Sequence, residues 1–184
     1  MTENHSDRAR FGQDDLAIIG ISCEVPGARD YRQFWENIRG GIESSRFLTA
    51  DELAARGVPA DLATNPRYVP VEFSIDGSEY FDPDFFNIPR ANAVLMDPQF
   101  RMLLQHSWKV VEDAGYRPRD IADCSVFVAT SNNYYGSSIG RSVDFDDSED
   151  YVAWMFAQGG SVPTRISYEL DLRGPSMSVH TNCS

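Results

Sequence analysis

The residue best suited to covalent chemistry is Cys183, the last residue but one of the chain. It closes the stretch G-P-S-M-S-V-H-T-N-C-S, which runs from Gly174 to Ser184 and alternates apolar with polar residues from Met177 onward. This period of two predicts a short strand that delivers the thiol at its end. A thiolate is the reactive form of cysteine, and acyl transfer through a thioester is the chemistry that such a residue serves best.

The surroundings of Cys183 favour an acyl nucleophile over a hydrolase dyad. On an extended strand His180 lies roughly 10 Å from Cys183 and on the opposite face, so direct proton transfer between them is disfavoured. If a helix begins just beyond Cys183, its dipole favours the thiolate, and the Cys183 backbone N–H is a candidate donor to an oxyanion. We expect Cys23 and Cys124 to be packed structural thiols, and the lone helical His106 to be a surface or packing residue.

Composition narrows the class of protein. The 184 residues suit one domain, and a net charge of -12 argues against binding to nucleic acid or to anionic membranes. The cysteines form no C-x-x-C pair, so we expect neither a metal site nor a disulfide, and a reducing cytoplasm is the natural location. Residues 1–14 are polar and predict a flexible leader, and no apolar run reaches the roughly 18 residues of a membrane span.

The first elements predict the opening of an α/β layer. Leu16 to Ser22, L-A-I-I-G-I-S, is a near-continuous apolar run that predicts a strand buried on both faces and ended by Pro26-Gly27. Asp30 can then cap a helix that carries an apolar stripe and stops at Gly40-Gly41. Residues 42–90 are rich in proline and predict an irregular excursion, in which Asp51 to Arg56 can form a short helix.

The remaining elements return the chain repeatedly to one sheet. Aromatic residues anchor the end of the excursion to the core; they are Tyr80, Phe81, Phe85 and Phe86. Asp97-Pro98 starts the clearest helix, which ends before Gly115, and Ser125 to Thr130 is a second buried strand. An acidic segment, 144–150, precedes helices at 151–157 and 163–170, and the terminal strand follows. This order predicts a layered α/β domain.

Several stretches together resemble the N-terminal half of a β-ketoacyl synthase, and look most like the ketosynthase domain of modular polyketide synthases. They are collinear over residues 15–184: L-A-I-I-G-I-S-C-E-V-P-G-A from Leu16, F-W-E-N-I-R-G-G from Phe34, M-D-P-Q-F-R-M-L-L from Met96, E-D-A-G-Y from Glu112, and R-I-S-Y-E-L-D-L-R-G-P-S-M-S-V from Arg165.

The resemblance implies a thiolase-like layered α-β-α-β-α fold, of which residues 15–184 are an incomplete N-terminal half. It implies that Cys183 accepts an acyl chain from a phosphopantetheine arm and delivers it to the carbanion formed by decarboxylating a malonyl-type extender on an acyl carrier protein. Such enzymes serve polyketide or fatty-acid-like synthesis as homodimers beside neighbouring synthase domains. They bind no further cofactor in this segment, and condensation also needs two histidines and a lysine from the second half.

The sequence departs from the family pattern around the thiol and leaves two alternatives open. The family commonly has aspartate at the place of His180 and alanine at that of Asn182, and Asn87 and Pro89 replace a glycine and a serine. One alternative is a non-catalytic truncated or scaffold half. The other is a different thiolase-fold acyltransferase that uses acyl-CoA. In each case we expect the 184 residues alone to be inactive.

Overall fold

The computed structural model describes residue 12, residues 15–131, residue 135 and residues 148–180. The helices and strands of these residues are, in chain order, α1 (Tyr31–Gly40), β1 (Arg46–Phe47), α2 (Ala50–Ala55), α3 (Ala60–Ala63), β2 (Val71–Glu72), α4 (Arg90–Leu95), α5 (Pro98–Asp113), η1 (Pro118–Asp120), β3 (Val126–Val128), α7 (Ser148–Ala157), η2 (Gly159–Ser161), α8 (Val162–Glu169) and β4 (Ser176–Ser178).

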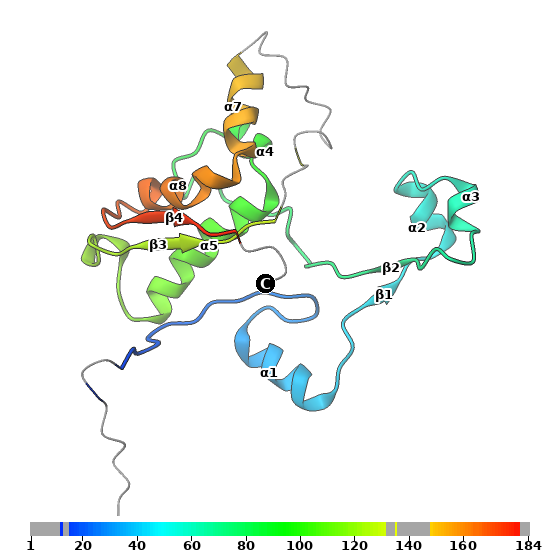
Figure 1. Ribbon diagram of the computed structural model, residues 1–184, viewed down its shortest axis with the longest axis horizontal. Helices are drawn as coiled ribbons and strands as arrows, with labels where there is room; N and C mark the ends of the chain where they lie inside the picture. Colours follow the sequence, from blue (N-terminus) through cyan, green and yellow to red (C-terminus); the bar gives the residue numbers. More distant parts are fainter. Residues whose placement is uncertain (1–11, 13–14, 132–134, 136–147, 181–184) are drawn as a thin grey trace, which may run out of the picture.

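The body of the molecule is a small parallel sheet covered by helices. β3 and β4 pair in parallel, with Val126 opposite Ser176 and Val128 opposite Ser178. Parallel neighbours need a long crossover connection, and this one carries α7, η2 and α8. Helix α8 packs against both strands, and α5 packs against α8 (Figure 1). The predicted α/β layer is confirmed, together with its helices at 97–114, 151–157 and 163–170 and its strand within 125–130.

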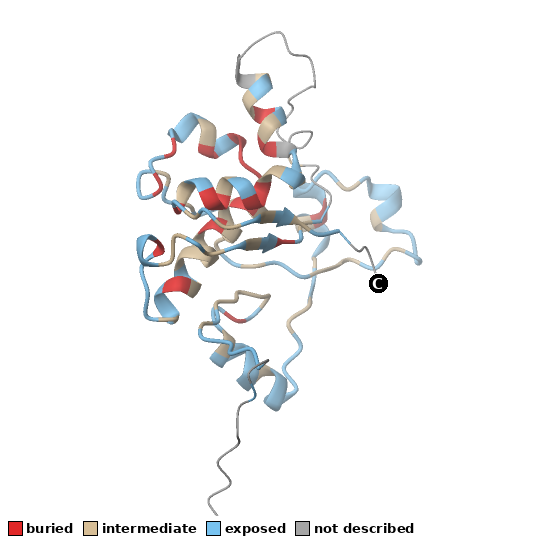
Figure 2. Ribbon diagram, turned by 60° about the vertical axis from the view of Figure 1, so that its left-hand side comes forward, coloured by how far each residue is buried: buried red, intermediate tan, exposed pale blue. Residues whose placement is uncertain are grey.

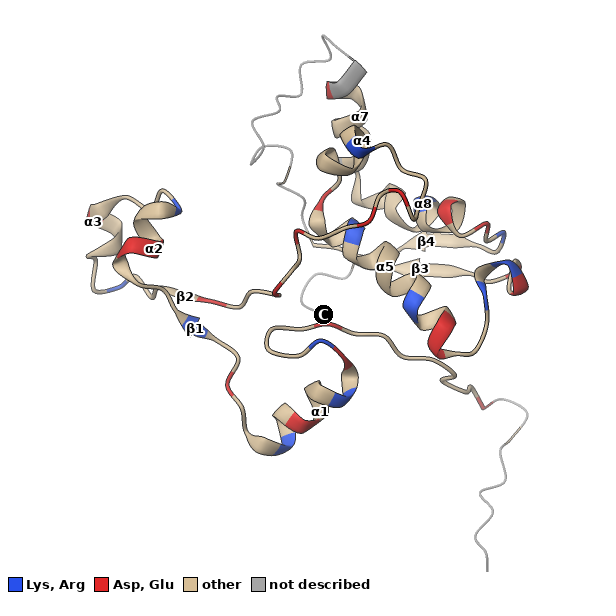
Figure 3. Cartoon of the chain, turned by 180° about the vertical axis from the view of Figure 1, so that it is seen from behind, with Lys and Arg blue, Asp and Glu red and all other residues tan. Residues whose placement is uncertain are grey.

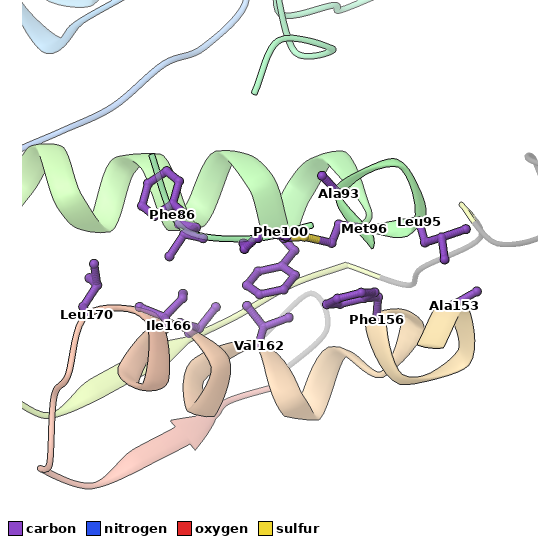
Figure 4. Close-up of a cluster of buried hydrophobic side chains, with 13 residues drawn as sticks. Phe86, Ala93, Leu95, Met96, Phe100, Ala153, Phe156, Val162, Ile166 and Leu170 are labelled. Carbon is purple, nitrogen blue, oxygen red and sulfur yellow. The ribbon is translucent and has the colours of Figure 1, made fainter. Parts of the chain in front are cut away.

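The hydrophobic core lies between α4 and α5 on one side and α7 and α8 on the other. Figure 4 shows Phe100 and Met96 facing Phe156, Val162 and Ile166 across this interface. Met96 and Leu104 are completely buried. Helix α5 starts as its sequence predicts, because the Asp97 carboxylate accepts a hydrogen bond from the Gln99 N–H at 2.6 Å and a proline follows.

Helix α1 has the predicted start and stop but little cover. The Asp30 carboxylate accepts hydrogen bonds from the N–H groups of Arg32 and Gln33, and Gly41 ends the helix in the left-handed region at φ 62°. None of its residues is buried. Figure 2 shows the buried residues concentrated in the body, whereas α1 is mostly exposed. Its apolar stripe therefore faces solvent in the described part of the chain.

The prediction of a strand buried on both faces at Leu16 to Ser22 is wrong for this structure. The segment is extended but belongs to no assigned strand, and Leu16 is 98% exposed. Gly20, Ile21 and Ser22 contact α5 or the residue that follows it. An apolar run of this kind needs cover from two layers, and the described residues supply one of them.

Residues 46–72 form a separate lobe that extends away from the body (Figure 1). β1 and β2 pair in antiparallel fashion at its base, with Arg46 opposite Glu72. The short helix predicted from Asp51 is present as α2, and Thr49 and Glu52 form its capping box. Arg46 closes the lobe through ion pairs with Glu52 and Glu72, each at 2.5 Å.

The excursion returns to the body through an acidic connector. Figure 3 shows acidic residues, in red, spaced along the chain between β2 and α4. The predicted aromatic anchor holds for Phe81 and Phe86, whose rings stack with centroids 5.4 Å apart, and for Phe85, which meets Trp108 edge-on at 4.8 Å. It is wrong for Tyr80, which is 75% exposed because the connector carries it over the surface of the body.

Candidate active site

Strand β4 leads directly to the segment that holds the predicted nucleophile. The Val179 N–H donates to the Val128 carbonyl at 2.8 Å, so pairing with β3 continues one residue beyond the assigned strand. Residues 181–184, and with them Cys183 and Asn182, lie outside the described residues. The strand prediction is therefore confirmed for its first part, and the role of Cys183 stays a prediction.

His180 is described, and its ring is already engaged by another side chain. Its Nε2 lies 2.9 Å from the Ser178 hydroxyl oxygen. Side chains two residues apart on an extended chain share a face, as these two do. The prediction that His180 and Cys183 point to opposite faces rests on the same alternation, because these two residues are three positions apart.

Gly159 lies close to the C-terminal end of β4. The Ser178 hydroxyl donates to the Gly159 carbonyl oxygen at 3.4 Å. A Cβ atom on Gly159 would lie 2.9 Å from Thr130 Oγ1 and 3.9 Å from His180 Cε1, which is too close for the first of these atoms. The sequence gives no sign that the ends of β3 and β4 approach Gly159 so closely.

The end of β3 is held by the start of α5. The Ser131 N–H and hydroxyl both donate to Gln99 Oε1, at 3.2 and 2.8 Å. Beside them, the Thr130 hydroxyl oxygen is buried and has no hydrogen-bond partner among the described residues. A buried hydroxyl without a hydrogen-bond partner costs free energy, and Thr130 places such a group at the end of β3. Sequence reasoning did not single out Thr130 or Gln99.

The far end of α8 carries a second incompletely paired polar group. Burial raises the pKa of Glu169, and Arg165, whose guanidinium lies 3.9 Å away, only partly opposes the shift. The Arg165 Nε is buried without a hydrogen-bond partner in the described part of the chain. Its guanidinium also lies 5.2 Å from the centre of the Phe156 ring. This pair lies at the C-terminal end of α8, before the turn into β4.

The other cysteines and His106 lie away from the C-terminal end of β4, and Cys124 lies beside its start. Cys23 and Cys124 are both free and half-buried, in keeping with packed thiols. His106 is half-buried on α5, where its Nδ1 lies 2.7 Å from the Ser22 hydroxyl oxygen. Within the described residues there is no group of three or more side chains able to hold a metal ion, and no helix is long and apolar enough to cross a membrane. The acidic segment 144–150 lies mostly outside those residues.

Strand β4 is a parallel strand with α8 packed against it, and it leads in the sequence to the segment that carries Cys183. The chain belongs to the β-ketoacyl synthase family: the model of the β-ketoacyl synthase N-terminal domain matches residues 13–184. The fold class predicted from the sequence, the N-terminal portion of a thiolase-like domain, is confirmed.

Among its relatives are ketosynthases of modular polyketide synthases. The chain is 47% identical over 176 residues to polyketide synthase PksN of Bacillus subtilis strain 168, a match that covers 95% of this chain and 3% of that protein. Two solved structures from Bacillus amyloliquefaciens are also similar. Ketosynthase twelve of the bacillaene polyketide synthase is 48% identical with a TM-score of 0.80. The module 1 ketosynthase of the bacillaene synthase is 44% identical with a TM-score of 0.78. Each match covers 91% of this chain and 29% of the solved one.

Proposed function

We propose that this chain is the acyl-accepting part of a ketosynthase domain in a modular polyketide synthase, with Cys183 as the nucleophile. The observation that carries the proposal is the likeness to the solved bacillaene ketosynthase, at 48% identity over 91% of the chain. The match to the family model extends through the segment that contains Cys183. The chain spans only 29% of that solved structure, so the activity belongs to a larger domain.

The first step uses only a residue of this chain. The Cys183 thiolate attacks the carbonyl carbon of an acyl thioester, and the new bond joins the cysteine sulfur to the acyl group. The bond to the phosphopantetheine sulfur breaks, and that sulfur leaves as a thiolate that takes up a proton. The Cys183 backbone N–H is the donor we propose for the oxyanion that forms in between.

The second step needs groups that this chain does not supply. Decarboxylation of a malonyl-type extender on an acyl carrier protein gives a carbanion, which attacks the acyl-cysteine carbonyl and releases the thiolate. In the family two histidines and a lysine of the second half serve this step, so we propose that the 184 residues alone do not condense. We propose the acyl carrier protein, the adjoining synthase domains and a second copy as the partners. A cytoplasmic location and the lack of a bound cofactor stay predictions.

The test is acyl loading of the full ketosynthase domain that carries this chain. We expect intact-protein mass spectrometry to show one acyl group added from an acyl carrier protein thioester, and none in Cys183→Ala. Cys124→Ala is the matched control, because Cys124 is free and half-buried and precedes β3, at the opposite end of the parallel sheet from Val179; it should load normally.

Two outcomes would contradict the proposal. Loading that persists in Cys183→Ala would show that another residue is acylated. Loading that occurs from acyl-CoA but not from the carrier protein would favour a different thiolase-fold acyltransferase.

A further inference from the structure

The extended segment 20–24 lies against α5 and pairs with none of the described strands. Figure 1 shows the N-terminal segment running past the lower end of α5. Its contacts with the helix come in reverse order along the two elements: Gly20 meets Val110 and Ala114, whereas Ser22 meets His106. The segment therefore runs antiparallel to α5, from the helix C-terminus toward its middle.

Gly20 makes the closest of these approaches. A Cβ atom at this position would lie 2.5 Å from the Val110 carbonyl oxygen and 3.0 Å from the Ala114 Cβ. The carbonyl belongs to the helix backbone and cannot turn aside as a flexible side chain would. Only glycine fits here, so this point of the segment is fixed relative to α5.

Two polar contacts follow directly after the glycine. The Ile21 N–H donates to Asp113 Oδ2 at 2.8 Å, so a helix carboxylate takes the place of a neighbouring strand's carbonyl. The Ser22 hydroxyl oxygen lies 2.7 Å from His106 Nδ1. These bonds join residues 92 and 84 positions apart in the chain, which makes them tertiary contacts.

His106 also faces Glu24, on the same side of the segment as Ser22. Its Nε2 lies 3.5 Å from Glu24 Oε2, and its side chain is 16% exposed. Burial lowers the pKa of His106, Lys109 lowers it further, and Glu24 opposes the shift. One tautomer of the neutral ring satisfies both neighbours: Nε2–H points to the carboxylate, and Nδ1 accepts from the Ser22 hydroxyl.

The apolar residues of this segment cannot set its register by themselves. L-A-I-I-G-I is apolar at nearly every position, so a slip of one residue exchanges one apolar side chain for another. The same slip would place Ile21 or Cys23 against His106, and would move a Cβ atom into the space that Gly20 leaves. The contacts with α5 distinguish the registers, and the apolar pattern does not.

We propose that α5 acts as a template that sets the register of the N-terminal segment. His106 binds Ser22 and Glu24, and Asp113 accepts a hydrogen bond from the Ile21 N–H. Gly20 allows the close approach of the segment to the helix backbone. The groups that face His106 are Glu24 on the segment and Lys109 on the helix.

The first test is the state of His106 in the full ketosynthase domain that carries this chain. Long-range proton–nitrogen correlation spectra of histidine-labelled protein should show the Nε2–H tautomer, with His106→Gln identifying the signal. The titration midpoint should lie below 6.5, and Ser22→Ala should move both the midpoint and the Nδ1 shift. Ser74→Ala, on an exposed serine, is the matched control. An ordinary midpoint that is indifferent to Ser22→Ala would overturn the proposal.

The second test reads the register through hydrogen exchange of the Ile21 amide in the same protein. Asp113→Ala should speed this exchange about tenfold or more, the loss expected for one strong hydrogen bond. Asp113→Asn keeps an acceptor oxygen and should restore most of the protection, and Asp123→Ala, on an exposed aspartate, should change nothing. Exchange that is unchanged in Asp113→Ala would show that a neighbouring strand holds this amide instead, and would overturn the proposal.

Discussion

Leu104 shows how strongly single residues hold this body together. It is completely buried in the core between α5 and α8. We expect Leu104→Ala to lower the free energy of unfolding of the full domain by about 2–5 kcal/mol, because it leaves a cavity in addition to losing the transfer energy. Urea unfolding followed by circular dichroism measures the change.

Leu62→Ala is the control for Leu104→Ala. Leu62 lies on α3 in the lobe and is substantially exposed, so its loss should cost no more than about 0.5 kcal/mol. Equal losses for the two substitutions would mean that the core does not lie where this structure places it.

At the scale of single residues, the sequence predicts the candidate nucleophile but not the residues packed around the strand that leads to it. Cys183 could be singled out because its residue type and its place after an alternating stretch are both visible in the sequence. Gly159 and Thr130 could not, because their importance arises from contacts between segments far apart in the chain. The sequence predicts that His106 is a surface or packing residue, but not its partners Ser22 and Glu24, which lie more than eighty positions away.

At the scale of elements, the capping box of α2 should be visible as a strongly shifted carboxyl. The Thr49 backbone N–H, the Arg46 guanidinium and the Thr49 hydroxyl bond to Glu52 and lower its pKa from 4.5 to about 2. A lowered pKa means that the carboxylate stabilises α2 above about pH 4.5, and that this contribution is lost as the pH falls toward 2.

A carboxyl titration by NMR tests the capping box directly. We expect the Glu52 midpoint to lie near 2, and to rise in Thr49→Val, which removes the hydroxyl donor. Glu36, exposed on α1, serves as the internal comparison in the same spectra. A Glu52 midpoint that matches an ordinary glutamate would mean that the box is not formed in solution.

Helices were predicted better than strands because their ends are marked locally. Asp30, Asp97 and Gly41 mark helix ends where the structure has them, since caps depend on neighbouring residues. The strand at Leu16 to Ser22 was predicted from its burial pattern, which depends on what covers it. In the described part of the chain Leu16, Ile18 and Ile19 stay mostly exposed, so the pattern is present and the strand is not.

At the scale of the whole molecule, the sheet of the body carries exposed apolar side chains in the described part of the chain. Phe127 and Met177 lie opposite each other on β3 and β4 and are both exposed, as is the neighbouring Val179. The isoleucines of segment 16–22 and the apolar stripe of α1 are exposed as well. Large exposed apolar surface marks an interaction face or an aggregation risk.

We therefore expect the 184 residues alone to bind a hydrophobic dye such as ANS and to self-associate in sedimentation experiments. The full ketosynthase domain that carries the chain should show neither behaviour, because further layers would cover the sheet. A monomer that unfolds sharply on heating and binds no dye would contradict this expectation.

The lobe of residues 46–72 begins and ends at the same place, because β1 and β2 pair at its base. A segment whose two ends are hydrogen-bonded to each other can be exchanged for another of different length. The entropic cost of closing the loop grows only slowly with the length inserted. Evolution can lengthen, shorten or exchange this part of the chain without rebuilding the core between α5 and α8. The same property makes the base of the lobe a natural place to insert a reporter domain.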